Sequence, residues 1–251
     1  MYGRFLCCYN VINAYNIINM KLIAISGESG SGKSTVAKLI QYVIAKEDKH
    51  TYNLLNPWDS DWKTDQSYKL DLKYIQEVLD EYTENEWWLE EQSWFKIKSF
   101  ATPLKETYCN FKGISLEGFN KDKESHRPYL IALGDKIREW DKNAFVNCLF
   151  KDSISGMKTH IIWGHVSQEA IYNNIIIDDL RFKNEYEAVK SRGGVTIRIE
   201  RDFFSIISNN EHQSEADLDD IQDWDYKINN SGSLEDLIEQ VKVILKKENL
   251  I

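Results

Sequence analysis

Residues 27–34 read GESGSGKS and match the pattern G-x-x-x-x-G-K-[ST] at every fixed position. Before them, residues 21–26 form a short apolar run typical of a strand, and after them residues 34–45 place apolar side chains at helical spacing. The pattern requires this order of strand, loop and helix. The sequence therefore predicts a phosphate-binding loop near the start of an α/β domain.

The residue types in this loop suit a nucleotide polyphosphate. Glycines allow the tight turn that brings successive backbone N–H groups, and the positive end of the following helix, to phosphate oxygens. Lys33 would reach the β- and γ-phosphates and the Ser34 hydroxyl would ligate Mg²⁺, so ATP and Mg²⁺ are the expected cofactors. A turn that binds nothing would explain the glycines but neither Lys33 nor Ser34. The expected nucleotide contacts are Gly27, Ser29, Gly30, Ser31, Gly32, Lys33, Ser34 and Thr35.

Length and charge limit the partners. A chain of 251 residues with 42% apolar residues favours one α/β domain with insertions over two full domains. The formal net charge of -9 argues against a nucleic-acid polymer as partner, because such proteins usually present a basic surface. A small-molecule nucleotide needs only a few local cations, so it stays compatible with this charge.

The cysteines and the absence of a long apolar run indicate the cell compartment. Four cysteines form no C-x-x-C pair, which favours reduced thiols in a cytoplasm, and Cys109 and Cys148 are predicted to be small core residues. No run approaches the length of a membrane helix, so no membrane is expected as a partner. The predicted location is the cytoplasm, that of the host if a phage encodes the chain.

The chain is predicted to form a single domain over residues 20–251. Residues 1–19 resemble a signal peptide only weakly, because asparagines interrupt the apolar segment and no small-residue cleavage site follows. Met20 directly precedes the first strand. This position favours Met20 as the native start of translation, with residues 1–19 as an N-terminal extension. An extra strand or helix packed on the domain is the alternative.

Two segments are predicted to depart from the core of the domain. Residues 52–95 form a Trp-rich insertion containing a helix over 68–82, and its tryptophans either cover the core or bind a partner. Residues 202–223 are polar, acidic and weakly periodic, which is the character of a mobile lid or of a solvated loop.

A second strand-to-helix junction is predicted after the insertion. Residues 94–100 alternate as a strand, and a helix then opens with Thr102 as N-cap and Pro103 in its first turn. Ligands of α/β sheets lie at the carboxyl ends of strands, so Lys105 is a candidate phosphate contact. Further along, residues 166–172 are interpreted as a short helix.

An apolar run at 174–177 ends in two acids, Asp178 and Asp179, as expected of a buried central strand that delivers a carboxylate to a nucleotide site. The two side chains point to opposite faces if the strand continues, so at most one serves Mg²⁺ or substrate directly. A pair that only caps the strand end is the alternative. Arg201 is expected at the carboxyl end of the next strand, 195–200.

Taken in order, these segments resemble the bacteriophage deoxynucleoside monophosphate kinases from about Met20 to the C-terminus. The most specific are F-A-T-P-L-K-E at 100–106 and D-L-R-F-K-N-E at 179–185. The other segments are the phosphate loop, 127–134, 212–215 and 228–234. Ile131 stands where related sequences tend to have Gln. Without that amide, the resemblance does not indicate which nucleobase is recognised.

The resemblance implies roles for several charged residues. Lys105, Arg127 and Arg138 would bind the acceptor nucleotide, and Asp179 would serve it as well as being a second candidate Mg²⁺ ligand. The implied catalytic residues are Lys33, Asp179, Arg181 and Arg201, with Arg201 on the side of the lid.

The expected fold is a three-layer P-loop NTPase, with a mostly parallel central sheet flanked by helices, a helical substrate-binding insertion and a lid. The implied reaction transfers the ATP γ-phosphoryl group to a deoxynucleoside 5′-monophosphate. Two alternatives stay open: a P-loop kinase of another small acceptor, and a nucleotide-dependent regulatory or adaptor protein. The accepted base, the preference for deoxyribose and the formation of a homodimer are not fixed by the sequence.

Overall fold

The computed structural model describes residues 21–47, 95–151, 156–162, 165–171, 174–201 and 217–251. These residues fall into two compact units. The sheet unit comprises the described parts of 23–97 and 176–251, and the helical unit comprises those of 98–175 with the chain up to Leu22. The predicted extension 1–19, the helix 68–82, nearly all of the Trp-rich insertion 52–95 and residues 202–216 of the predicted lid lie outside the described residues.

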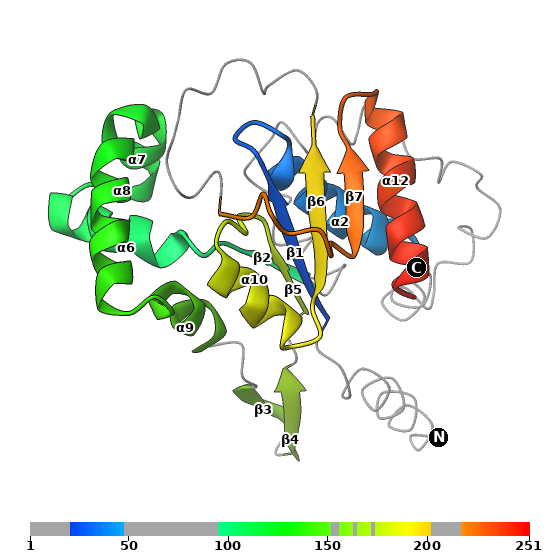
Figure 1. Cartoon of the computed structure of the whole chain (residues 1–251). Coiled ribbons are helices and arrows are strands. Elements are labelled where there is room, and N and C mark those ends of the chain that lie inside the picture. The colour runs from blue at the N-terminus through cyan, green and yellow to red at the C-terminus, as the bar shows by residue number, and fades with distance from the viewer. Residues whose placement is uncertain (1–20, 48–94, 152–155, 163–164, 172–173, 202–216) are drawn as a thin grey trace. The chain divides into compact units, whose positions relative to one another are not determined.

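A five-stranded sheet with the order β2-β5-β1-β6-β7 forms the centre of the sheet unit (Figure 1). Its strands are β1 (Leu22–Gly27), β2 (Phe95–Lys98), β5 (Asn174–Ile177), β6 (Val195–Glu200) and β7 (Tyr226–Asn229). β6 pairs in parallel with β1 and with β7. Counted along the chain, the strands of this sheet lie in the order 2-3-1-4-5, so the chain changes direction across the sheet beside β1. Ligands of open α/β sheets bind at such a switch point, outside the carboxyl ends of the strands.

Helices cover both faces of the sheet. α2 (Lys33–Glu47) and α12 (Leu234–Lys247) share one buried cluster with Ile197 and Ile199 of β6. Side chains alternate along a strand, so Thr196 and Arg198 face the other way, toward α10 (Lys183–Lys190). In Figure 1, α10 crosses in front of the sheet and α2 lies behind it. The predicted α/β fold of helices on a mostly parallel sheet is confirmed.

Local sequence signals explain several element boundaries. The Ser233 side chain accepts a hydrogen bond from the Asp236 N–H, and the Asp236 carboxylate accepts one from the Ser233 N–H, which forms a capping box at the start of α12. Inside this helix the apolar residues recur on one buried face, as the sequence predicts. Ile23 and Ile25 of β1 are fully buried, as expected for a central strand covered on both faces.

The helical unit contains four helices and a hairpin among its described residues. They are α6 (Thr102–Lys112), α7 (Leu116–Lys121), α8 (Lys123–Trp140), α9 (Ala144–Lys151), β3 (Gly156–Ile162) and β4 (His165–Ile171). Tyr108 and Cys109 of α6 pack against Phe119 of α7 and form a small core. The Tyr108 hydroxyl also lies 2.9 Å from Nδ1 of His126, which ties α6 to the first turn of α8.

Three local predictions in this unit are wrong. The N-cap of α6 is Ala101 and Thr102 is already helical, because Ser99 supplies the turn that receives the Thr102 N–H. The helix expected over 166–172 is the strand β4, paired antiparallel with β3, so long-range pairing prevails over local periodicity. Cys109 is buried as predicted, but Cys148 is exposed, on the outer face of the amphipathic helix α9.

Candidate functional site

The loop between β1 and α2 has a backbone that only glycine adopts readily. Gly27, Gly30 and Gly32 have φ values of +155°, +76° and +98°. A Cβ atom at Gly27 would lie 2.7 Å from the carbonyl oxygen of Ile199, on the neighbouring strand β6. The glycines therefore allow the loop to curl back tightly against the sheet, as a phosphate cradle requires.

Lys33 lies at the first position of α2 with its ammonium group held by the loop. Its Nζ donates hydrogen bonds of 2.7 Å to the carbonyl oxygens of Gly27 and Glu28. The positive charge is thus placed on the loop itself, beside the N-terminus of a 15-residue helix. Both charges favour an anion in the same place.

The Ser34 hydroxyl donates a hydrogen bond to a carboxylate that follows β5. Its Oγ donates a 2.9 Å hydrogen bond to Oδ2 of Asp178, 144 residues further along the chain. Hydroxyl and carboxylate oxygens are ligands that Mg²⁺ accepts, and Mg²⁺ usually takes only one or two protein ligands beside substrate phosphates. Ser34 and Asp178 therefore fit the chemistry of a Mg²⁺ site at this loop.

The local sequence does not show which of Asp178 and Asp179 points toward the phosphate loop. Ile176, two residues before Asp178, belongs to the buried cluster formed with α2. Alternation along the strand places Asp178 on this same side, where α2 begins with Ser34. Sequence reasoning through the resemblance selected Asp179 instead. The signal that identifies Asp178 is the face of β5 that α2 covers, and no local pattern reveals this face.

Asp179 and Arg181 lie in the turn between β5 and α10, and both are half-buried. The Leu180 N–H donates to the carbonyl oxygen of Ile25 on β1, and the Leu180 side chain is buried. Glu185, 2% exposed, accepts hydrogen bonds at one carboxylate oxygen from the N–H groups of Arg181 (2.9 Å) and Phe182 (3.1 Å). The D-L-R-F-K-N-E segment is therefore a fixed turn at the end of β5, and Glu185 is its internal support.

Two residues, one after β6 and one after the edge strand β7, contact the phosphate loop from outside. Arg201, directly after β6, donates from Nη1 to the carbonyl oxygen of Gly30 at 3.3 Å. Asn230, directly after β7, donates from Nδ2 to the carbonyl oxygen of Ser31 at 2.8 Å. Sequence reasoning named Arg201 and missed Asn230, whose contact joins positions 199 residues apart.

Residues 217–223, the described part of the predicted lid, are fastened to the sheet unit. Asp217 accepts the N–H of Lys183 at the start of α10, and the ammonium of Lys183 pairs with Asp220 at 2.7 Å. Asp219 pairs with Arg198 of β6 at 3.0 Å, and Leu218 between these acids is buried. This stretch is an anchored turn that carries the chain from residue 217 back to the sheet.

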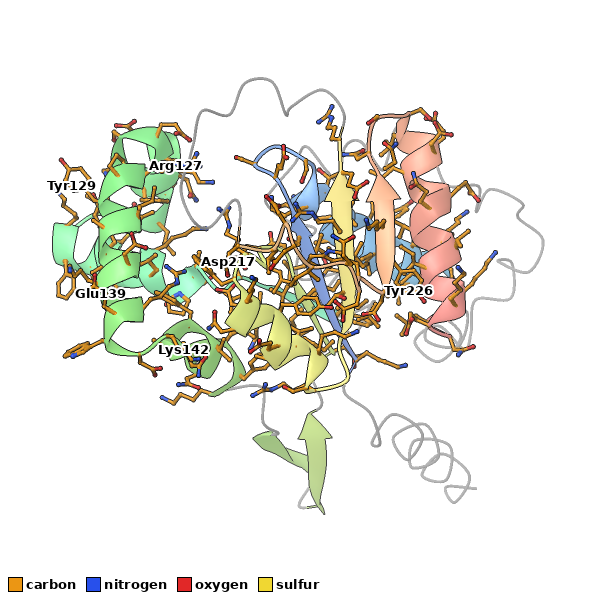
Figure 2. All side chains as sticks on the ribbon, viewed as in Figure 1. Arg127, Tyr129, Glu139, Lys142, Asp217 and Tyr226 are labelled. Atoms are coloured by element: carbon orange, nitrogen blue, oxygen red, sulfur yellow. The ribbon has the colours of Figure 1, made fainter. Side chains whose placement is uncertain are left out.

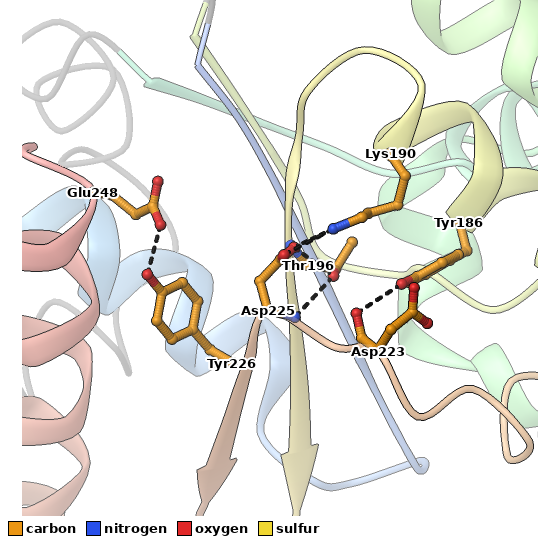
Figure 3. A network of polar contacts seen from close by, with 7 residues as sticks. All are labelled: Tyr186, Lys190, Thr196, Asp223, Asp225, Tyr226 and Glu248. Atoms are coloured by element: carbon orange, nitrogen blue, oxygen red, sulfur yellow. Dashed lines mark hydrogen bonds and ion pairs between the residues drawn. The ribbon is translucent and has the colours of Figure 1, made fainter.

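A network of polar side chains continues this anchorage into β7 (Figure 3). Asp225 accepts hydrogen bonds from Lys190 and from Thr196. Partial burial alone would raise the pKa of Asp225, but these hydrogen bonds outweigh it and hold the pKa below its ordinary value. The Tyr226 hydroxyl donates a 2.6 Å hydrogen bond to Glu248, and this bond, together with burial, raises the pKa of Tyr226 to about 12.

The three expected acceptor-side cations belong to the helical unit, Lys105 on α6 and the two arginines on α8. The Arg127 guanidinium lies 3.7 Å from the Glu124 carboxylate, and Figure 2 shows Arg127 on α8. The Arg138 guanidinium lies 4.7 Å from the ring centre of Phe145. Its Nη1 atom lies 3.9 Å from a carboxylate oxygen of Asp135. Their role toward a second nucleotide stays a prediction, as do the roles of Asp179 and Arg181.

Within the described residues, no helix is both long and apolar enough to span a bilayer. In the same part of the chain, His, Cys, Asp and Glu side chains form no group of three that could hold a metal ion.

A glycine-rich phosphate loop at the switch point of this sheet, with its serine bonded to a strand-end aspartate, defines a P-loop nucleotide-binding protein. The model of the phosphoribulokinase / uridine kinase family matches residues 22–82. A protein of Acanthamoeba polyphaga mimivirus named "Putative deoxynucleotide monophosphate kinase" is 34% identical over 158 residues, which cover 59% of this chain and 81% of the viral protein. The chain belongs to the family of this viral protein and is a phosphotransferase of the P-loop kinase class.

These similarities agree with the kinase part of the predicted resemblance. The bacteriophage character of the family, the cytoplasmic location and the formation of a homodimer stay predictions. The division into one domain over 20–251, with an insertion and a lid, stays a prediction as well.

Proposed function

We propose that this protein transfers the γ-phosphoryl group of ATP to a deoxynucleoside 5′-monophosphate, giving ADP and the deoxynucleoside diphosphate. The observation that carries the proposal is the hydrogen bond between Ser34 and Asp178, at a loop whose carbonyl oxygens also hold the Lys33 ammonium. It joins the phosphate loop to the strand-end carboxylate in the manner that phosphoryl transfer with a metal ion needs. The name of the 34% identical viral relative supports a deoxynucleotide as the acceptor.

The acceptor itself needs little activation. A phosphate monoester has a second pKa of about 6, so at neutral pH it is largely a dianion and attacks without a catalytic base. The main tasks are then to bring two anions together and to neutralise charge as the phosphoryl group moves. A cluster of fixed cations suits these tasks better than an acid and base pair does.

In this proposal, the loop amides and Lys33 bind the β- and γ-phosphates. Ser34 and Asp178 hold Mg²⁺, which when bound neutralises phosphate charge, and Asp179 is a second candidate ligand that can also contact the acceptor. Arg201 donates a hydrogen bond to the loop at Gly30, and this contact supports a role in which its guanidinium neutralises charge on the phosphates.

The acceptor monophosphate is assigned to Lys105, Arg127 and Arg138, with Arg181 beside the reacting phosphates. Arginine suits this task because its planar fork donates to two phosphate oxygens at once. Two anions must be held together, so the Lys33 ammonium alone is not enough.

A coupled assay of ADP release tests the proposal. Purified protein is supplied with Mg²⁺ and ATP, together with one member of a panel of ribo- and deoxynucleoside monophosphates. Uridine and ribulose 5-phosphate are added to the panel because the matching family model bears the names of kinases for these two acceptors. We expect ADP release to depend on a deoxynucleoside monophosphate. ADP release that occurs only with uridine or the sugar phosphate would refute the assigned acceptor. ADP release at the same rate with and without every acceptor would indicate an ATP-dependent switch protein.

A further inference from the structure

Asn230 connects the end of the sheet with the phosphate loop. Its backbone N–H donates to the carbonyl oxygen of Glu200 at 2.8 Å, which extends the pairing of β7 with β6 by one more bond. Its side-chain Nδ2 donates to the carbonyl oxygen of Ser31, also at 2.8 Å. The side chain is thus anchored at its own backbone and reaches the loop from a rigid strand end.

The bond to Ser31 constrains a particular peptide group. A trans peptide is planar, so its C=O and N–H bonds point in opposite directions. Holding the Ser31 carbonyl oxygen toward Asn230 therefore turns the Gly32 N–H away from Asn230. The Ser31 N–H is already donated to the carbonyl oxygen of Glu28 at 3.2 Å, so the loop is also closed from within.

Asn230 also lies close against position 32 of the loop. A Cβ atom on Gly32 would lie 2.4 Å from Nδ2 of Asn230, and the φ of +98° already disfavours any other residue. The amide of Asn230 therefore lies directly against the α-carbon of Gly32. The asparagine contacts the Ser31 to Gly32 peptide on the side opposite to the Gly32 N–H.

We propose that Asn230 is a positioning residue for ATP: it holds the Ser31 carbonyl oxygen so that the Gly32 N–H faces the bound phosphates. This inference rests on the proposed function, because it assumes that the loop binds ATP. It assigns Asn230 no contact with the nucleotide. The asparagine acts by fixing the backbone of the cradle in advance, so that binding does not have to order it.

The test replaces Asn230 by Asp, which has the same shape but cannot donate to the Ser31 carbonyl oxygen, and by Ala, which removes the donor without adding charge. Asn229→Asp is the matched control. It adds the same charge one residue away, and its carboxylate keeps the acceptor role that Asn229 Oδ1 has toward the N–H of Ser231. Each variant is measured for ATP dissociation constant, for the KM of ATP and of the acceptor, and for Tm.

We expect ATP to bind at least ten-fold more weakly to Asn230→Asp and several-fold more weakly to Asn230→Ala, with the KM of the acceptor and the Tm close to the wild type. Asn229→Asp should bind ATP like the wild type. Equal ATP affinity of Asn230→Ala and the wild type would overturn the inference. A loss of Tm with both KM values raised would overturn it too, because Asn230 would then only stabilise the fold. Failure of the wild type to bind ATP would instead refute the proposed function.

Discussion

The buried carboxylate of Glu185 offers a quantitative test of how the turn after β5 is held. Both the Arg181 and Phe182 N–H groups donate to the same carboxylate oxygen, and the side chain is 2% exposed. Glu185→Ala removes this acceptor from two backbone donors at the start of α10. Hydrogen bonds to a charged group contribute about 1.5–3 kcal/mol each, and their sum is reduced where water can reach the released groups.

We therefore expect Glu185→Ala to lower the free energy of unfolding by about 3 kcal/mol. For a chain of this length, such a loss corresponds to a fall in Tm of roughly 6–12 °C. Glu185→Gln keeps an acceptor oxygen for both N–H groups, so its loss should be about 1 kcal/mol. Urea denaturation followed by circular dichroism measures these differences.

Glu187→Ala is the control, because Glu187 is an exposed residue of the same helix and a surface change of this kind is expected within about 0.5 kcal/mol. If Glu185→Ala unfolds at the same urea concentration as Glu187→Ala, the turn is not held by this carboxylate and the reasoning is wrong.

Three further predictions concern the phosphate loop and the end of the sheet. Lys33→Ala should reduce phosphoryl transfer by several orders of magnitude while the circular dichroism spectrum stays unchanged; near-normal turnover would remove Lys33 from the mechanism. Asp178→Asn should raise the Mg²⁺ concentration needed for half-maximal activity by about 10–100-fold, and an unchanged Mg²⁺ titration would show that Ser34 needs no carboxylate partner. The raised pKa of Tyr226 means that its bond to Glu248 stabilises the fold fully below pH 10, the ordinary value, and loses its effect as the pH rises toward 12. Wild-type stability should consequently fall more steeply than that of Tyr226→Phe over this range, and parallel curves would contradict the assignment.

The parts of the fold with a strong local signal could be predicted from the sequence. β6 runs from Val195 to Glu200 as expected, because its apolar and polar residues alternate in a strand with two paired edges. The phosphate loop lies between a strand and a helix because its glycines permit positive φ angles. The capping box of Ser233 with Asp236 marks the start of α12.

Features set by contacts between distant residues could not be predicted in the same way. Which aspartate meets Ser34 depends on the face of β5 that α2 covers, and the local sequence contains both acids. The hairpin of β3 and β4 depends on pairing between two segments, each of which is ambiguous alone. Asn230 acts on a backbone group 199 residues away, so it leaves no pattern of charge or spacing that identifies its partner.

The central claim is that one loop holds ATP while a second, already charged phosphate accepts its γ-phosphoryl group. It is tested most directly by following the label of γ-³²P-ATP in the presence of Mg²⁺ and a deoxynucleoside monophosphate. We predict that the label appears in the deoxynucleoside diphosphate, and that this transfer is lost in Lys33→Ala. Label that appears only as inorganic phosphate, at a rate independent of the monophosphate, would contradict the account.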